Sequence, residues 1–561
     1  MELREITIQN FRQVHEATFT VQDYSLLVGA NNAGKSTVVD CLRAFYRHQR
    51  YEFNAGRDFP KDPARAGEES FIELTYSLTD DEVQNLPEKY RLADNILKVK
   101  KWFCNQPEDR EANAIYGYET TGQLSEDRIF GAANVQKGRL GKVVYIPAVS
   151  KVDEHTKLTG PSALRDAIAG LMKTVISGSP AYEEFAARFE TFVQTVRTAD
   201  TEDGRSIEAF GRSLSGKLEG WSTRFELVFT PPAAQEITKH MIDWQLTDLH
   251  GQEIGHGIDQ FGSGFQRHLI AAVIQTSAEF GARPAATRRT FAPDLTLLLF
   301  EEPEAYLHPP QQAQLARDLR AIASNQHWQV IASTHSPLFV SRNTADLQSL
   351  VRLRNDGGVT TCYQLRPGTE ERIFSARAEI EAVLGRWEEL SDEDRAQLER
   401  VRYFLWLDNE RCSLFFSDLV LLVEGATELA LFSRLLDDGR LVLRGRACSV
   451  LHSDGKFNTI RFMRLLNALG LPFVVIHDRD DERRPRHARL NQLIAGEAAD
   501  SDFCLGVEIL DPDLESFLEW PAPGEDRRYL KPAMILLNYE ERAEETPQLN
   551  DLCSRLRDIV A

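Results

Sequence analysis

The sequence predicts an α/β chain made of two successive α/β domains, and three observations support this prediction. A glycine-rich turn joins an apolar strand to a helical pattern within residues 24–45. An apolar strand at 295–300 ends in two glutamates. Two further apolar strands, at 419–423 and 473–476, also end in acidic residues. Strands that alternate with helices and end in polar loops are typical of parallel sheets, whose carboxyl edge carries the functional groups.

The turn that runs from Gly29 to Thr37, GANNAGKST, matches the pattern of a phosphate-binding loop. In such a loop backbone N–H groups surround phosphate oxygens, while Lys35 reaches the outer phosphates and Ser36 faces a magnesium ion. The strand before the turn and the helical pattern after it favour this interpretation over a chance glycine turn. The candidate nucleotide-binding residues of the loop are Asn31, Asn32, Gly34, Lys35, Ser36 and Thr37.

Two later strands supply the remaining groups of an ATPase site. The first ends at Glu301, in the position of a metal-side carboxylate, and Glu302, in the position of a general base. The second, at 330–332, is followed by His335. A lone histidine is more often structural, but a histidine directly after a strand of this sheet is placed to sense the γ-phosphate.

A helix that begins with Ser263 and Gly264 lies between the loop and these strands. Its first residues are suited to offer a hydroxyl and N–H groups to a γ-phosphate. The order and spacing resemble the ABC-type ATPase heads, in which the signature of one protomer closes over ATP held by the other, and the resemblance therefore implies a homodimer. Two departures, the signature GSGFQR and a glutamate at Glu301, affect the expected turnover rate and leave the expected nucleotide binding unchanged.

Acidic residues follow two strands in the last third of the chain. Glu424 ends the first strand, and Glu428 lies in the first turn of the next helix, where it can point back toward Glu424. Asp478 and Asp480 end the second strand and would share a face in extended chain. Carboxylates this close need a compensating cation, and oxygen ligands favour Mg²⁺ or Mn²⁺.

This acidic pattern resembles the Toprim domain, which has a glutamate before glycine on one strand and a DxD motif on a later one. Together the two halves of the chain resemble the OLD (overcoming lysogenization defect) family of nucleases, and Gabija defence nuclease subunits share this layout. The segments that carry the resemblance are IQNFR at 8–12, EEPEAYLHP at 301–309, STHSP at 333–337, VEGATE at 423–428 and DPDLE at 511–515.

The resemblance implies an ATP-binding and ATP-hydrolysing, metal-dependent DNA endonuclease that defends against bacteriophage. Two metal ions would activate water and stabilise the leaving oxygen. The family also uses a lysine near the carboxyl end to stabilise developing charge; Lys531 matches this place best, and Lys456 is the competing candidate. The metal ligands implied are Glu424, Glu428, Asp478 and Asp480, with Asp454, Asp511 and Glu515 as supports.

Sequence patterns predict five segments: an ATPase head at 1–160 and 226–375, a helical insertion at 161–225, a helical connector at 376–415 and a Toprim domain at 416–561. In OLD proteins a helical dimerisation module occupies the place of this insertion. A helical subdomain that packs on its own head is the alternative. The absence of a sustained heptad run separates the chain from the SMC-like repair ATPases.

Composition restricts the partners. The chain has 65 basic and 85 acidic residues and a formal charge of −20, which argues against a nonspecific coat for nucleic acid but not against a local basic groove. Such a groove could be formed by Arg483, Arg484, Arg486 and Arg489, although a solvated loop is the simpler interpretation. The seven scattered cysteines favour a reducing cytoplasm, and no apolar run is long enough to predict a membrane span.

Several alternatives stay open at this stage. A DNA-repair or recombination ATPase with a Toprim domain that binds DNA without cutting it is the main competitor. Topoisomerase or primase activity would need a tyrosine motif or a zinc module, and neither is visible. The sequence does not decide between a dimer and a tetramer, between nicking and double-strand cutting, or between activation and inhibition by ATP. It also leaves open whether the protein acts alone or with a helicase or retron partner.

Overall fold

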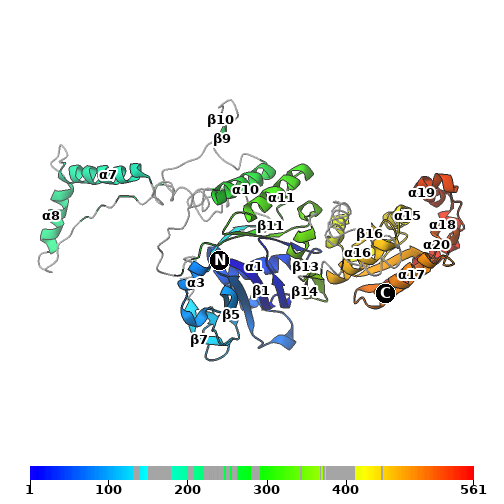
Figure 1. The fold of residues 1–561 in the computed structure, drawn as a ribbon. Coiled ribbons are helices and arrows are strands. Elements are labelled where there is room, and N and C mark those ends of the chain that lie inside the picture. Colours follow the sequence, from blue (N-terminus) through cyan, green and yellow to red (C-terminus); the bar gives the residue numbers. More distant parts are fainter. Residues whose placement is uncertain are drawn as a thin grey trace, which may run out of the picture. The chain divides into compact units, whose positions relative to one another are not determined.

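The computed structural model describes residues 1–130, 139–148, 179–199, 206–218, 262–279, 293–341, 344–366, 411–443 and 447–561, with a few short stretches between 227 and 255 and single positions near 291 and 370. The chain divides into two compact units, residues 1–148 with 288–561, and residues 149–287. Figure 1 shows the elements of both units. Most of the predicted connector, residues 376–410, and the start of the predicted insertion lie outside the described residues.

A twelve-stranded sheet, in the order β7-β6-β5-β4-β1-β2-β14-β13-β3-β12-β11-β8, forms the first half of the larger unit. The strands β13, β3, β12, β11 and β8 run parallel to their neighbours in this order, as expected for a nucleotide-binding sheet. These five strands are β13 (Leu350–Asp356), β3 (Tyr24–Val28), β12 (Trp328–Ser333), β11 (Thr296–Glu301) and β8 (Lys142–Ile146).

The remaining strands of this sheet form a mainly antiparallel extension. They alternate buried and exposed side chains, which is the pattern of a sheet with one face on a core. The strands are β1 (Glu2–Phe11), β2 (Val14–Thr20), β4 (Ser70–Ser77), β5 (Ile96–Cys104), β6 (Ile115–Tyr118), β7 (Leu124–Phe130) and β14 (Val359–Gln364).

Helix α1 (Lys35–Tyr46) follows the glycine-rich turn and packs on this core. Its predicted apolar positions, Val38, Val39, Leu42 and Phe45, are fully buried. At its carboxyl end the ammonium of Lys101, a β5 residue that is 1% exposed, donates hydrogen bonds to the carbonyls of Ala44 (2.9 Å) and Phe45 (3.0 Å). These bonds satisfy carbonyls that a helix end leaves without an internal partner.

The carboxyl-terminal domain has a four-stranded, all-parallel sheet in the order β16-β15-β17-β18. Its strands are β16 (Cys448–His452), β15 (Leu419–Val423), β17 (Phe473–Asp478) and β18 (Cys504–Leu510). Its longer helices are α15 (Ala426–Asp437), α16 (Lys456–Ala468), α17 (Pro485–Ala499), α19 (Lys531–Arg542) and α20 (Pro547–Val560). Because all four strands are parallel, their carboxyl ends lie at one edge.

The second unit is largely helical where it is described, with α7 (Pro180–Thr198), α8 (Ile207–Leu218) and α10 (Ser263–Glu279). Along α7 the rings of Phe185, Phe189 and Phe192 follow one another at centroid distances of 6.2 Å. Phe185 and Phe192 are exposed. None of the helices in the described ranges is long and apolar enough to cross a lipid bilayer.

We expect Lys101 to make stability depend on pH. Burial, with Arg47 nearby, lowers the pKa of Lys101 from 10.5 to about 7. Between about pH 7 and about pH 10 the unfolded chain therefore binds more protons at this residue than the native protein does. The contribution of Lys101 to the free energy of unfolding rises with pH across this window. A Lys101→Met variant lacks this contribution, so its thermal midpoint should fall relative to wild type as the pH rises through this window. Thermal unfolding curves across the pH range measure the difference.

Lys98→Met is the matched control, because Lys98 lies on the same strand and pairs with Glu73 at the surface. Parallel pH profiles for Lys101→Met and wild type would contradict the prediction.

Candidate ATPase and nuclease sites

The phosphate-binding loop is held against two neighbouring strands. Gly29 and Gly34 have φ angles of 138° and 103°, a region that favours glycine. A Cβ atom on Gly29 would meet the Leu353 carbonyl oxygen at 2.2 Å, and one on Gly34 would meet Thr360 side-chain atoms at 2.8 Å. Both glycines of the predicted motif are thus required by backbone conformation and by close packing.

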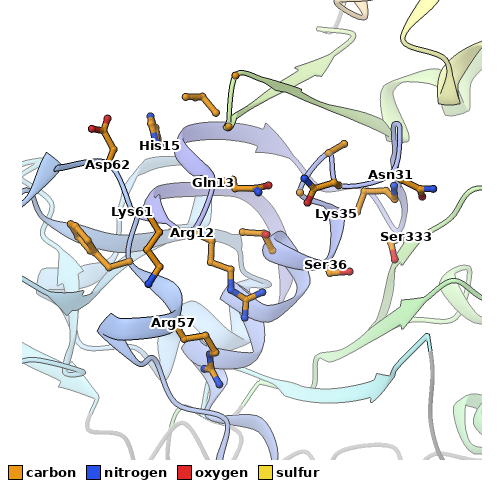
Figure 2. Close-up of a pocket in the computed structure, with 18 of the residues that line it drawn as sticks. Arg12, Gln13, His15, Asn31, Lys35, Ser36, Arg57, Lys61, Asp62 and Ser333 are labelled. Atoms are coloured by element: carbon orange, nitrogen blue, oxygen red, sulfur yellow. The ribbon is translucent and has the colours of Figure 1, made fainter. Parts of the chain in front are cut away.

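A cavity of about 800 Å³ opens at this loop (Figure 2). Its lining includes eight of the predicted ATPase residues, namely Asn31, Asn32, Gly34, Lys35, Ser36, Thr37, Glu302 and His335. The ammonium of Lys35 donates to the carbonyls of Gly29 (2.9 Å) and Ala30 (3.0 Å). Burial lowers the pKa of Lys35 to about 8, opposed by Glu302 and Glu304. Ser263 and Gly264 belong to the other unit, so their predicted role stays a prediction.

Glu301 is the last residue of β11, beside this cavity, and is 7% exposed. Burial raises the pKa of its carboxyl group, whereas hydrogen bonds from Ser36 and Tyr145 lower it. The Tyr145 hydroxyl donates to Glu301 Oε2 at 2.5 Å, and the Arg43 guanidinium stacks 3.8 Å from the Tyr145 ring centroid. Glu301 and Ser36, the two residues predicted to face magnesium, therefore meet, and Tyr145 fixes the long glutamate side chain.

Glu304 positions the segment that carries His335. Its carboxylate accepts hydrogen bonds from the Thr334 hydroxyl (2.6 Å) and the His335 backbone N–H (2.5 Å). Burial and the charge of Lys35 lower the pKa of His335, so the ring favours its neutral form. The sequence motif EEPEAYLHP contained Glu304, but only the structure gave this residue its role.

Basic residues on the opposite wall of the cavity were missed by sequence reasoning. Figure 2 shows Arg12, Arg57 and Lys61 around the cavity with Lys35 and Ser36. The Arg12 guanidinium pairs with Asp40 and Asp58, each at 2.9 Å. These residues come from separate segments, so no local motif identified them as cavity residues.

The carboxyl edge of the second sheet gathers the predicted nuclease carboxylates. Glu424 Oε2 accepts from the Asp478 backbone N–H at 3.3 Å, and Glu428 Oε2 accepts from the Gly425 N–H at 2.9 Å. Burial, together with the charges of Glu428, Glu424, Asp480 and Asp513, raises the pKa of Asp478 to about 9. Burial likewise raises the pKa of Glu424 to about 7. The carboxylates are therefore crowded together and need positive charge.

Two lysines approach this cluster from different elements. Lys456, the first residue of α16, lies 2.5 Å from Asp480 Oδ2 and 4.0 Å from Glu424 Oε2. Lys531, the first residue of α19, pairs with the buried Glu515 at 2.9 Å. The charges of Asp513 and Asp478 also act on Lys531 and raise its pKa. Both candidates for the catalytic lysine thus lie at the cluster.

The structure places the three supporting carboxylates differently. Glu515 is buried and lies near Glu428, whose pKa it raises. Asp454 pairs with Arg411 (2.8 Å) and His452 (2.9 Å). Asp511 pairs with Arg479 at 3.1 Å. Asp513 was not predicted; its side chain caps the turn at 514–517 and its charge acts on Asp478.

The extended-chain argument for Asp478 and Asp480 is wrong in its geometry. Strand β17 ends at Asp478, and Asp480 has a φ angle of 59°, which is a left-handed conformation. Asp480 reaches the cluster through this turn and not by sharing a strand face.

The donor set fits a divalent cation, because its members are oxygen ligands crowded by burial and by one another. In the described ranges no three His, Cys, Asp or Glu side chains are already arranged as a complete metal site. Glu424, Glu428, Asp478 and Asp480 are the side chains that would hold the ion.

Comparisons with known proteins identify related domains in both halves of the chain. A family model described as AAA ATPase domain matches residues 1–136 and 167–340, more than half of the chain. A second, described as overcoming lysogenization defect protein-like, TOPRIM domain, matches residues 415–480. The OLD nuclease of Thermus scotoductus is 26% identical over 559 residues, which cover 94% of this chain and 93% of that protein.

The chain belongs to the OLD family of nucleases. The Old nuclease of Escherichia phage P2 is 23% identical over 86% of this chain and 77% of its own length. Endonuclease GajA of Bacillus cereus is 27% identical over 40% of this chain and 31% of its own length. An SMC head bound to the C-winged helix domain of ScpA covers 66% of this OLD-family chain at 13% identity, with a TM-score of 0.38, too low to support an argument.

We expect Tyr145→Phe to weaken ATP hydrolysis by this OLD-family protein. The variant removes the hydroxyl that fixes Glu301, and a hydrogen bond to a charged group contributes about 1.5–3 kcal/mol. The hydrolysis rate at low Mg²⁺ should therefore fall roughly tenfold to a hundredfold, with partial recovery at high Mg²⁺. Steady-state ATPase assays across a Mg²⁺ series measure this.

Tyr46→Phe is the matched control, because Tyr46 donates to or accepts from Tyr76 and contacts the Leu140 carbonyl without touching a carboxylate. An unchanged Mg²⁺ dependence in Tyr145→Phe would exclude a role for the tyrosine at Glu301.

Proposed function

We propose that this protein is a metal-dependent DNA endonuclease whose cutting is controlled by ATP binding or hydrolysis in its head. The observation that carries the nuclease assignment is the crowded set of carboxylates at the edge of β15 and β17, with a lysine on each side. A domain that only bound DNA would have no need for anions that repel a phosphate backbone. The same observation disfavours the non-cleaving repair ATPase.

The residues divide into ligands and charge-stabilising groups. Glu424, Glu428, Asp478 and Asp480 would hold Mg²⁺ or Mn²⁺, which supplies an activated water and a Lewis acid at the scissile phosphate. Lys531 would stabilise the charge that develops on the phosphate oxygens, and its pair with Glu515 would orient its ammonium group. Glu302, which follows Glu301 at the cavity, is proposed as the general base for ATP hydrolysis.

A basic surface beside the metal site supports DNA as the substrate. Arg483 and Arg484, just before α17, and Arg486 and Arg489, in its first turns, are exposed and follow Asp480 after Asp481 and Glu482. Guanidinium groups bind phosphate oxygens in bidentate geometry, so these side chains are suited to hold the backbone of DNA next to the carboxylates. This local cluster reconciles a DNA substrate with the net charge of −20.

We also propose a homodimer or a higher homo-oligomer. The support is the exposed aromatic row of α7 with Phe185 and Phe192, in the insertion where the OLD resemblance expects a dimerisation module. The signature residues Ser263 and Gly264 would then complete the ATP site of a second protomer. Defence against bacteriophage, alone or with a helicase or retron partner, is the biological role that the OLD resemblance suggests.

We expect Asp478→Ala to abolish plasmid cutting in Mg²⁺ or Mn²⁺ while ATP hydrolysis persists, because the substitution removes a central ligand and leaves the head intact. Lys35→Ala, in contrast, should lose ATP binding in the head. Agarose-gel nicking assays with and without EDTA, at several ATP concentrations, measure both. Equal cutting by wild type and Asp478→Ala would place the nuclease site elsewhere, and cutting by neither under any condition would favour the non-cleaving ATPase.

Two contacts connect the ATP site with the nuclease domain. Arg352 of β13, which pairs in register with Val28 just before the phosphate loop, donates to the carbonyls of Ser417 (3.1 Å) and Gly470 (2.9 Å). His335 lies with its ring 6.3 Å from that of Phe416. Residues 416–417 lead directly into β15, which ends at Val423, the residue before Glu424. We propose that these contacts carry the effect of nucleotide to the nuclease site.

We expect Phe416→Ala to reduce the effect of ATP on DNA cutting without abolishing either activity. The variant removes the ring beside His335 but touches neither the phosphate loop nor the carboxylates. The ratio of cutting rates with and without ATP should move toward one, while the ATPase rate stays close to wild type. Leu537→Ala, which truncates an exposed apolar side chain of α19, is the control. An ATP effect as large as in wild type would exclude this route.

A further inference from the structure

Lys456 has an unusual setting for a lysine in a nuclease site. The residue is 5% exposed, although its side chain carries a charge that is costly to bury. Its ammonium lies 2.5 Å from Asp480 Oδ2 and 4.0 Å from Glu424 Oε2. The group therefore lies between two of the four carboxylates that are proposed to hold the metal ions.

A second, neutral partner anchors the same ammonium. Lys456 Nζ donates to Asn491 Oδ1 at 3.0 Å. The Asn491 amide is itself fixed, because its Nδ2 donates to the Arg479 carbonyl (2.9 Å) and to Glu482 Oε1 (3.1 Å). An ammonium that leaves Asp480 would thus keep a hydrogen bond inside the protein.

A divalent ion and an ammonium cannot both neutralise Asp480 at close range, because the two cations repel one another. We propose that Lys456 is the internal counter-ion of the metal site: it neutralises Asp480 and Glu424 before metal binds, and a divalent ion acquires Asp480 only by displacing it toward Asn491. This inference rests on the proposed metal-dependent nuclease. It assigns Lys456 a positioning role and leaves charge stabilisation to Lys531.

Two consequences follow for the free protein. The lysine offsets the mutual repulsion of the carboxylates, so the metal-free domain is more stable with it than without it. The lysine also competes with the ion, so the intrinsic affinity of the site for a divalent cation is reduced. Lys531 does not have this position, since its ammonium pairs with Glu515 and not with Asp480.

The test measures Mn²⁺ binding to the full-length protein by isothermal titration calorimetry and the thermal midpoint in EDTA. We expect Lys456→Met to bind Mn²⁺ several-fold more tightly than wild type and to unfold at a lower temperature in EDTA. Saturating Mn²⁺ should restore the midpoint. Lys456→Arg, which keeps the charge, should bind Mn²⁺ close to wild type, and Lys531→Met is the matched control for loss of a positive charge nearby.

Unchanged or weaker Mn²⁺ binding by folded Lys456→Met would overturn the inference, as would the same gain in affinity for Lys531→Met. If Lys456→Met folds only with Mn²⁺, the counter-ion role is supported. If it does not fold in either condition, Lys456→Gln, which keeps a polar group for Asn491, is judged by the same affinity criterion. Failure of wild type itself to bind Mn²⁺ would refute the proposed metal-dependent nuclease, a result that differs from all of these.

Discussion

The central physical constraint in this protein is the repulsion among carboxylates that a parallel sheet brings to one edge. Strands β15 and β17 are adjacent and parallel, so Glu424 and Asp478 come close although they are far apart in the chain. Burial and this proximity raise the pKa of Asp478 to about 9. Two lysines bring positive charge to these carboxylates, and each is the first residue of a helix, Lys456 of α16 and Lys531 of α19.

Buried carboxylates in the ATPase head are also stabilised by neighbouring groups. Glu301 accepts hydrogen bonds from two hydroxyl groups, those of Ser36 and Tyr145. Glu304 accepts from Thr334 and from the backbone of His335, which fixes the segment that would sense the γ-phosphate. Lys35 rests on backbone carbonyls of its own loop. The ATPase site is therefore ordered by hydrogen bonds among its own residues.

Hydrogen bonds to backbone carbonyls and contacts between aromatic rings join the two domains. Arg352 donates to carbonyls at the end of α16 and before β15, and burial lowers its pKa to about 10. Helix α16 carries Lys456 at its other end. A change at the phosphate loop could therefore act on the nuclease carboxylates through a continuous set of packed elements, which gives the proposed ATP dependence a physical basis.

The sequence by itself determined the elements that local patterns specify. The sequence predicted the phosphate loop, the strands that lead to Glu301, Glu424 and Asp478, and the two-part α/β architecture. These predictions were possible because few other local structures are compatible with an apolar run that ends in glycine or acidic residues. The sequence also determined the family, since these motifs occur in a fixed order along nearly the whole chain.

Only the tertiary structure decided which distant side chains meet. The hydrogen bond from Tyr145 to Glu301 joins β8 to β11, and the contact of Lys456 with Asp480 joins a helix start to a turn in left-handed conformation. The structure also distinguished two of the predicted supporting carboxylates: Asp454 pairs with Arg411, whereas Glu515 lies at the carboxylate cluster. No local pattern encodes such pairs, because they depend on strand order and on the turns that end each strand.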